Sequence, residues 1–143
     1  MAILNDRDRQ AVIAELARLG GPVKLVVFSQ ELIAGDLCRQ NEQLMREVAE
    51  LTDGKATVEV LNPVIDRERA DAYGVDQVPA TVVEGARDYG IRFYGIPSGY
   101  EFSNLIDAMI VASTGAPQLS EATRSSLAAL AGDVQIKVFS TPT

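Results

Sequence analysis

The hydrophobic pattern along the chain switches between a helical repeat and short, continuous apolar runs. Apolar residues recur at helical spacing in four segments, which predict helices over residues 6–19, 36–51, 66–73 and 98–114. Four runs rich in β-branched and aromatic residues predict strands over residues 23–28, 57–61, 81–84 and 89–94. The first strand is apolar on both faces except at Lys24, which is typical of a central strand covered on both sides.

Glycine, proline and polar residues mark where these elements begin and end. Asn5 or Asp6 can cap the first helix, and Gly74 is the expected stop of the short helix. Ser98 and Glu101 have the spacing of a capping box at the start of the last long helix. Strands joined through a helix lie parallel, and the hairpin at residues 85–88 adds an antiparallel pair. The chain is therefore predicted to be an α/β protein with a four-stranded mixed sheet flanked by helices. Its element order resembles the thioredoxin fold with an extra N-terminal helix.

The end of the chain repeats its beginning. Residues 134–140 resemble residues 23–29, and the leucines and glycine before each strand fall at the same offset of 111 residues. One explanation is that strands preceded by helices look alike, and the other is a tandem duplication. If the chain is a tandem duplication, residues 1–115 form one unit, and residues 116–143 hold a linker with the opening helix and strand of a truncated second unit. The strand at residues 134–139 would lack its own sheet, so we expect it to add to the first unit's sheet or to pair with another copy.

Composition removes most kinds of chemistry. The chain has 20 acidic and 13 basic residues, and a net charge of −7 argues against a nucleic-acid partner. No apolar run approaches the roughly 20 residues that cross a bilayer, and no signal segment opens the sequence, so no membrane contact and a cytoplasmic location are expected. The absence of histidine excludes Ser-His-Asp and Cys-His catalysis and removes the commonest zinc ligand. No metal or cofactor is expected, and thiol chemistry remains.

Cys38 is the only cysteine in the chain. A strand and a short loop place it in the first turn of the predicted helix, where the helix dipole favours a thiolate over a thiol. The other interpretation is a small hydrophobic side chain buried on the inner face of the helix, because free cysteine is often buried.

Several motifs together resemble the protein disulfide oxidoreductase family, whose members carry two thioredoxin-fold units in tandem. The resemblance rests on residues 22–25, 47–53, 73–81 and 88–102. Residues 138–143 are similar to the run that precedes the Cys-Pro-Tyr-Cys motif of the family's second unit. The N-terminal domain of the flavoprotein component of alkyl hydroperoxide reductase is a more distant likeness.

The resemblance implies where an active site would lie and what it has lost. Cys38 falls on the second, resolving cysteine of the family's Cys-x-x-Cys motif, and Gly35 falls on the first, nucleophilic one. The segment 31–34 is about one residue longer than usual. Val78 and Pro79 fall on the family's cis-proline turn, where the backbone offers a strand edge to a bound peptide or thiol compound. The alternative there is an ordinary trans proline at the start of a strand.

These implications lead to one expected function and two alternatives. The chain is expected to be the N-terminal half of a thiol–disulfide oxidoreductase, inactive alone, that packs against a second unit or docks disulfide-containing protein substrates. In the first alternative, Cys38 acts as a monothiol that forms mixed disulfides with glutathione or a partner. In the second, the chain is a stand-alone thioredoxin-fold binding module.

Overall fold

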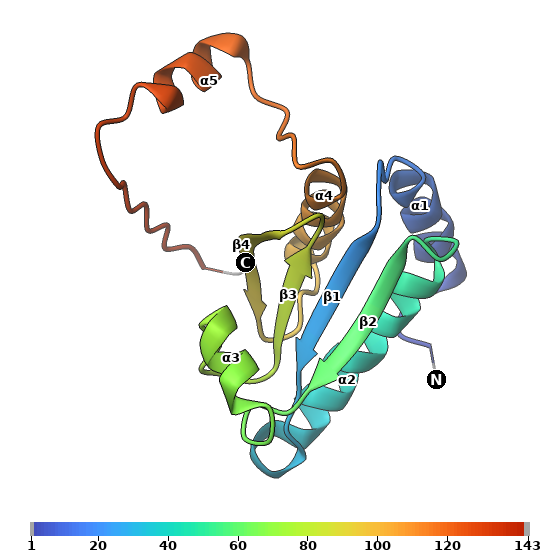
Figure 1. Ribbon diagram of the computed structural model, residues 1–143. Coiled ribbons are helices and arrows are strands. Elements are labelled where there is room, and N and C mark those ends of the chain that lie inside the picture. Colours follow the sequence, from blue (N-terminus) through green and yellow to red (C-terminus); the bar gives the residue numbers. More distant parts are fainter. Residues whose placement is uncertain (1, 142–143) are drawn as a thin grey trace.

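The computed structural model describes residues 2–141. The two domain ranges expected from the sequence, 1–115 and 116–143, therefore include three residues outside the described ones: Met1, Pro142 and Thr143. A four-stranded sheet with the order β2-β1-β3-β4 forms the centre (Figure 1). It consists of β1 (Val23–Phe28), β2 (Ala56–Leu61), β3 (Ala80–Glu84) and β4 (Asp88–Tyr94). β1 pairs in parallel with β2 and antiparallel with β3, which pairs antiparallel with β4. This mixed sheet confirms the predicted α/β fold class.

Helices cover both faces of the sheet. They are α1 (Asp6–Leu16), α2 (Glu31–Glu50), α3 (Arg67–Tyr73) and α4 (Tyr100–Thr114), whereas a fifth helix, α5 (Glu121–Ala128), lies apart from the sheet (Figure 1). On one face, α1, α2 and α4 share a hydrophobic core with Val23, Leu25 and Val27 of β1. On the other face, α3 packs over Val26 and Phe28 of the same strand. β1 is therefore apolar on both sides because each side has its own layer of helices.

The predicted capping box at the start of α4 is wrong. The residue before the helix is Gly99, whose φ of 59° and ψ of −125° turn the chain directly into the helix at Tyr100. No side chain caps the helix, and the Glu101 N–H donates to the backbone carbonyl of Ser98 at 3.2 Å instead. The helix begins one residue too late for Ser98 to act as its N-cap. At α1 the cap is as expected, since the Asn5 side chain accepts a hydrogen bond from the Asp8 N–H at 2.9 Å.

The start of α2 also differs from the prediction. The helix begins at Glu31 rather than at residue 36, and it is interrupted at Ala34, where φ is −143° and ψ is 45°. The extra residues of this segment are taken up by one additional helical turn and a kink. The continuous helix that carries Cys38 therefore begins at Gly35.

The expected terminal strand does not form within the chain. α5 has no buried residue, and the described residues after it, up to Thr141, contain no strand and pair with no part of the sheet. The expectation that this segment adds to the sheet of its own chain is therefore wrong. Helix-forming and strand-forming patterns produce stable elements only when a second layer covers their apolar faces, and here nothing covers them.

A buried carboxylate fixes the N-terminal segment to α2. The Glu47 oxygens accept hydrogen bonds from the backbone N–H groups of Ile3 at 2.8 Å and Leu4 at 3.0 Å, and from Gln43 Nε2 at 2.9 Å. Arg9 lies 3.8 Å away. Burial alone would raise the pKa of Glu47, but these hydrogen bonds and the charge of Arg9 outweigh it and hold the pKa below its ordinary value.

Replacing Glu47 with glutamine is expected to lower the free energy of unfolding by about 1.5–3 kcal/mol at pH 7, because charge-assisted hydrogen bonds are lost. A carboxyl whose pKa is lowered by folding stabilises the protein above its unfolded pKa, and this contribution disappears as the pH falls through the folded pKa. Urea unfolding at pH 7 and pH 3 should therefore show a smaller difference between wild type and variant at pH 3. Glu50→Gln, on the exposed face of the same helix, is the control. An equal difference at both pH values would contradict this role for the carboxylate.

Candidate functional site

Two chain segments meet where β1 ends. Phe28, the last residue of β1, lies opposite Ala80, the first residue of β3. The turn into α2 begins at Ser29, whose N–H donates to the Leu61 carbonyl at 2.9 Å. The turn before β3 and the start of α2 therefore lie at the same end of the sheet. The four residues singled out from the sequence belong to these two segments.

The Cys38 thiol points into the protein. Its exposed fraction is 0%, and the backbone N–H of Gln30 donates to the sulfur at 3.4 Å. Cys38 is the only thiol of the chain, and it is unpaired. A reagent or substrate disulfide cannot reach the sulfur unless the segment around Gln30 moves.

Gly35 lies one helical turn before Cys38 and is half-buried. It directly follows the kink at Ala34, so its side-chain position is at the beginning of the continuous helix. A Cβ atom built at Gly35 would have Arg39 Nη1 as its nearest neighbour, at 3.4 Å. Arg39 is exposed and forms an ion pair with Asp36. The position is therefore open enough for a small side chain.

The peptide bond between Val78 and Pro79 is cis. The Pro79 carbonyl accepts a hydrogen bond from the Gly95 N–H at 2.9 Å, which joins this turn to the end of β4. Val78 is half-buried and packs against the core cluster under α3, which includes Phe28. The turn thus lies beside the end of β1, next to the segment that leads to Cys38.

A buried polar pair next to this region was not foreseen from the sequence. The Asn41 amide nitrogen donates to the Thr81 hydroxyl at 3.0 Å, and both side chains are fully buried. The Asn41 amide oxygen has no hydrogen-bond partner among the described residues. The signal was present, because Asn41 lies three residues before Leu44 on the apolar stripe. The buried face of α2 is rotated relative to the predicted one, because Leu37, which was expected on it, is 52% exposed and Cys38 is buried.

Exposed apolar side chains surround this end of the sheet. Leu32 and Ile33 extend from the first turn of α2, and Val64 and Ile65 extend from the loop after β2. Both segments follow the carboxyl ends of neighbouring parallel strands, and Figure 1 shows them at the same end of the molecule. We call these four residues the apolar rim. An apolar rim beside the turn at Val78 and Pro79 is suited to contact with another protein surface.

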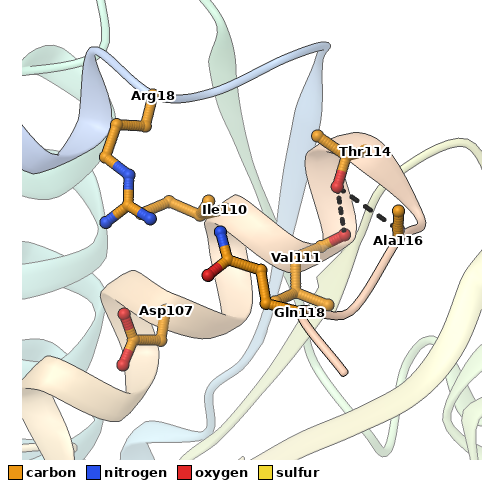
Figure 2. Close-up of a pocket in the computed structure, with 7 residues that line it drawn as sticks. All are labelled: Arg18, Asp107, Ile110, Val111, Thr114, Ala116 and Gln118. Atoms are coloured by element: carbon orange, nitrogen blue, oxygen red, sulfur yellow. Dashed lines mark hydrogen bonds between the residues drawn. The ribbon is translucent and has the colours of Figure 1, made fainter. Parts of the chain in front are cut away.

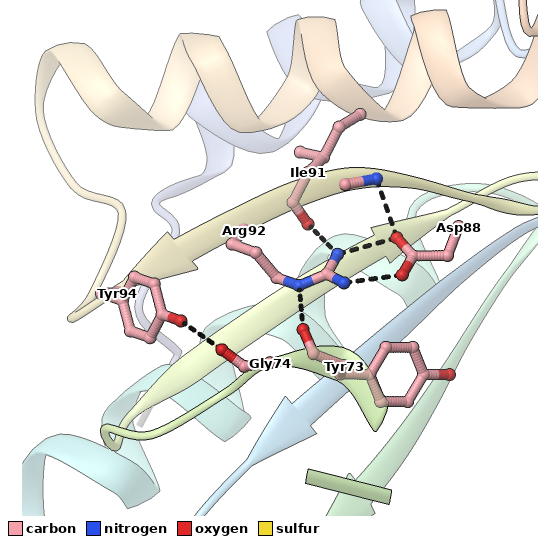
Figure 3. Close-up of polar contacts among 7 residues, drawn as sticks. Tyr73, Gly74, Asp88, Ile91, Arg92 and Tyr94 are labelled. Atoms are coloured by element: carbon pink, nitrogen blue, oxygen red, sulfur yellow. Dashed lines mark hydrogen bonds and ion pairs between the residues drawn. The ribbon is translucent and has the colours of Figure 1, made fainter. Parts of the chain in front are cut away.

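The polar cluster on β4 has a structural role. Arg92 forms hydrogen bonds with both carboxylate oxygens of Asp88, at 2.8 and 2.6 Å, and donates from Nε to the Tyr73 carbonyl at 3.0 Å (Figure 3). Hydrogen bonding to Arg92 holds the pKa of Asp88 below its ordinary value. The Tyr94 hydroxyl donates to the Gly74 carbonyl at 3.4 Å. These contacts join β4 to the end of α3. The charges of Arg92 and Asp88 pair with each other.

Several hollows of the described surface lie away from the predicted site residues. One of about 560 Å³ lies at the C-terminal end of α4, where Arg18, Asp107 and Gln118 supply its polar lining (Figure 2). Arg18 is already paired with Glu15 at 2.8 Å. Within residues 2–141, no group of three or more acidic, cysteine or histidine side chains is arranged to hold a metal ion. Among the described helices, none has the length and apolar character that crossing a bilayer requires.

Comparison with protein-family models and with curated proteins finds no match. Among solved structures, the chain is similar to the alkylhydroperoxide reductase AhpF from Enterococcus faecalis, with a TM-score of 0.78, 26% identity and 89% of this chain covered. A structure of the N-terminal domain of the same enterococcal protein gives a TM-score of 0.74 and 24% identity. A protein disulfide oxidoreductase from Aeropyrum pernix gives a TM-score of 0.76 and 23% identity, with 92% of this chain covered.

These likenesses confirm the thioredoxin-like fold and the resemblance to the two families predicted from the sequence. The fold is one that thiol–disulfide oxidoreductases share. The chain spans only 61% of the two enterococcal chains and 57% of the archaeal one. The similar proteins are thus larger than this chain, in keeping with a second unit in a parent protein.

Proposed function

We propose that this chain is a non-catalytic thioredoxin-fold unit of a thiol–disulfide oxidoreductase, which packs against a second unit and docks disulfide-containing protein substrates. The observation that carries the proposal is the state of the thiol. Cys38 is fully buried, and Gly35 stands one turn before it, where a nucleophilic cysteine would have to be. Dithiol exchange needs an exposed thiolate to attack and a second thiol to resolve the mixed disulfide.

The surroundings of the buried thiol support docking. The apolar rim and the turn at Val78 and Pro79 leave a surface on which an extended peptide can lie, although no thiol is exposed there. As part of the same proposal, residues 1–115 form the unit, and residues 116–143 begin a second one. The absence of any buried residue in α5 supports this division, because its one leucine, Leu127, would be covered in such a second unit.

Insulin reduction by dithiothreitol tests whether the chain is inactive. We expect the wild type and Cys38→Ala to give the same rate as dithiothreitol alone, because neither presents an exposed thiol. A thioredoxin measured in the same assay is the positive control. Activity in the wild type that disappears in Cys38→Ala would show that Cys38 is a working thiol and would refute the proposal.

A monothiol function is the second candidate, favoured by the position of Cys38 one turn into the helix that begins at Gly35. A single cysteine suits a reducing compartment such as the cytoplasm, where glutathione is present. Incubation with oxidised glutathione followed by intact-protein mass spectrometry separates the two. We expect no adduct on the native protein and one adduct after unfolding in urea. An adduct on the native protein would favour the monothiol.

A further inference from the structure

β2 forms one edge of the sheet, and its outer side is open. The N–H of Val23 donates to the carbonyl of Lys55, and the N–H of Ser29 donates to that of Leu61, so the odd-numbered residues of β2 point their backbone groups toward β1. Backbone groups of successive residues in a strand point to opposite sides, so the N–H and C=O groups of Ala56, Val58 and Val60 point outward, away from β1. Thr52 Oγ1 accepts the Ala56 N–H at 2.8 Å. The backbone of Val58 and Val60 remains available for another strand.

The opposite edge is less suited to strand addition. β4 contains Gly90 with a φ of 86°, and its register with β3 shifts between Val83 and Glu84. Irregular edges of this kind discourage pairing with further strands. β2 has no such irregularity, since its six residues pair in unbroken register with the six of β1.

The chain also contains an apolar segment that packs against none of the other described residues. Val134, Ile136, Val138 and Phe139 are all strongly exposed, up to 91% for Phe139. We call residues 134–139 the terminal segment. Its sequence, Val-Gln-Ile-Lys-Val-Phe, matches the pattern of β1, Val-Lys-Leu-Val-Val-Phe. The terminal segment is therefore similar to a strand that β2 already accepts on its inner side.

The register of β1 against β2 shows how such a strand fits. Val23 lies opposite Ala56, and Phe28 lies opposite Leu61, in parallel. The first, third and fifth residues of β1 face the core under α2, and the fourth and sixth face α3. In the same register on the outer side, Val134, Ile136 and Val138 face α2, as Val58 and Val60 do.

A hollow beside β2 can receive these side chains. It has a volume of about 330 Å³ and lies between the outer face of α2 and the edge of the sheet. Ala49 of α2 and Ala56 and Val58 of β2 supply the apolar part of its lining, and Arg46 and Glu50 supply the charged part. On the other face, the same register brings Lys137 beside the carboxylate of Glu59, which already pairs with Lys24 and Arg69.

We propose that the terminal segment of a second copy of this chain adds to β2 as a fifth, parallel strand, with Val134 opposite Ala56. A second copy is the occupant because each chain's own terminal segment lies on the far side of its unit, near β4 (Figure 1). Ser140 and Thr141 line a hollow with residues at the start of α4. Reciprocal exchange of two segments closes a symmetric dimer. The inference concerns the 143-residue chain and does not depend on whether Cys38 is reactive. In a parent protein with a complete second unit, as proposed above, the terminal segment would pack inside that unit instead.

Light scattering after size-exclusion chromatography tests the dimer. The 143-residue chain should elute with twice the mass of one copy, and the mass should fall on dilution. Ile136→Asp should raise the dimer dissociation constant roughly tenfold to a hundredfold, because a buried isoleucine is replaced by a charge. Leu127→Asp, at a similarly apolar and exposed position on α5, should leave it unchanged. A monomeric wild type, or a dimer that only Leu127→Asp disrupts, would overturn the proposal.

Disulfide trapping tests the edge and the register. In a Cys38→Ala background, Thr57→Cys and Gln135→Cys lie opposite each other in the proposed register, within the distance that a disulfide spans. Mild oxidation should give a covalently linked dimer on a denaturing gel. Tyr94→Cys with Gln135→Cys tests the β4 edge and should give no covalently linked dimer on the same gel. A crosslink only in the β4 pair, or a link within one chain in the β2 pair, would show that the proposed partner is wrong.

Discussion

Replacing Gly35 with cysteine is expected to give the chain dithiol reductase activity. Residue 35 follows the kink at Ala34 and lies one turn before Cys38, so the two sulfurs are on the same side of the helix. The position has room, because the nearest atom to a new Cβ is the end of the flexible Arg39 side chain, at 3.4 Å. Insulin reduction should rise from the dithiothreitol background to a rate proportional to the concentration of the variant.

The electrons in this reaction balance without a cofactor. The thiolate of the new cysteine attacks the substrate disulfide and releases one substrate thiol, and Cys38 then displaces the second. The chain is left with a disulfide between residues 35 and 38, which dithiothreitol reduces. Gly35→Ser is the matched control and should stay at background. Gly35→Cys with Cys38→Ala should accumulate mixed disulfide with insulin when dithiothreitol is left out, because no second thiol resolves it. If Gly35→Cys is no faster than Gly35→Ser, the assignment of Gly35 as the nucleophile position fails.

Replacing Gly85 with alanine is expected to lower the free energy of unfolding by about 3 kcal/mol or more. Gly85 follows β3 in the turn to β4, directly against α4. A Cβ there would lie 1.8 Å from the carbonyl oxygen of Ala112 and 2.6 Å from its carbon, both of them backbone atoms. A backbone cannot move aside as a side chain can, so α4 would have to shift from the sheet. Urea or thermal unfolding measures the loss.

Gly132→Ala is the matched control for this effect. No atom lies within 4 Å of a Cβ built at Gly132, and its backbone is not in the left-handed region. The free energy of unfolding should change by less than about 0.5 kcal/mol. Equal stability of the Gly85 and Gly132 variants would contradict the close approach of α4 to the turn.

The sequence predicted the sheet well because its strands carry short-range signals. β1 is apolar on both faces, and β3 and β4 are separated by a short polar turn, so both were recognisable from composition and spacing alone. Gly74 was expected to stop a helix, and it has a left-handed backbone with a φ of 67°. These features depend on residues close together in the chain.

Two features that were missed depend on distant residues. Glu47 looks like another helix-surface carboxylate, yet it is buried because Ile3 and Leu4 return to it from the N-terminus. Gly85 reads as an ordinary turn glycine, and only the position of Ala112 shows why a side chain cannot be accommodated. No local pattern contains these tertiary contacts.

The positions of Cys38 and Pro79 in the fold were predictable from the sequence, but the orientation of the thiol was not. The sequence placed Cys38 near the start of a helix and Pro79 beside it, and the structure brings their segments to the same end of the sheet. It did not show that α2 begins a turn earlier and kinks at Ala34. The direction of the thiol depends on that kink. The sequence indicated only that the segment before the helix is about one residue longer than usual.

The central position of β1 has a consequence for synthesis on the ribosome. Its parallel neighbour, β2, has been made once residue 61 has emerged, so β1, α2 and β2 can assemble early as half of the sheet. The other neighbour, β3, begins only at residue 80. α4, which covers β1 on the same face of the sheet as α2, is made after β3. Until then β1 keeps an uncovered apolar edge. We therefore expect nascent chains shorter than about 115 residues to depend on chaperones more strongly than the finished unit does.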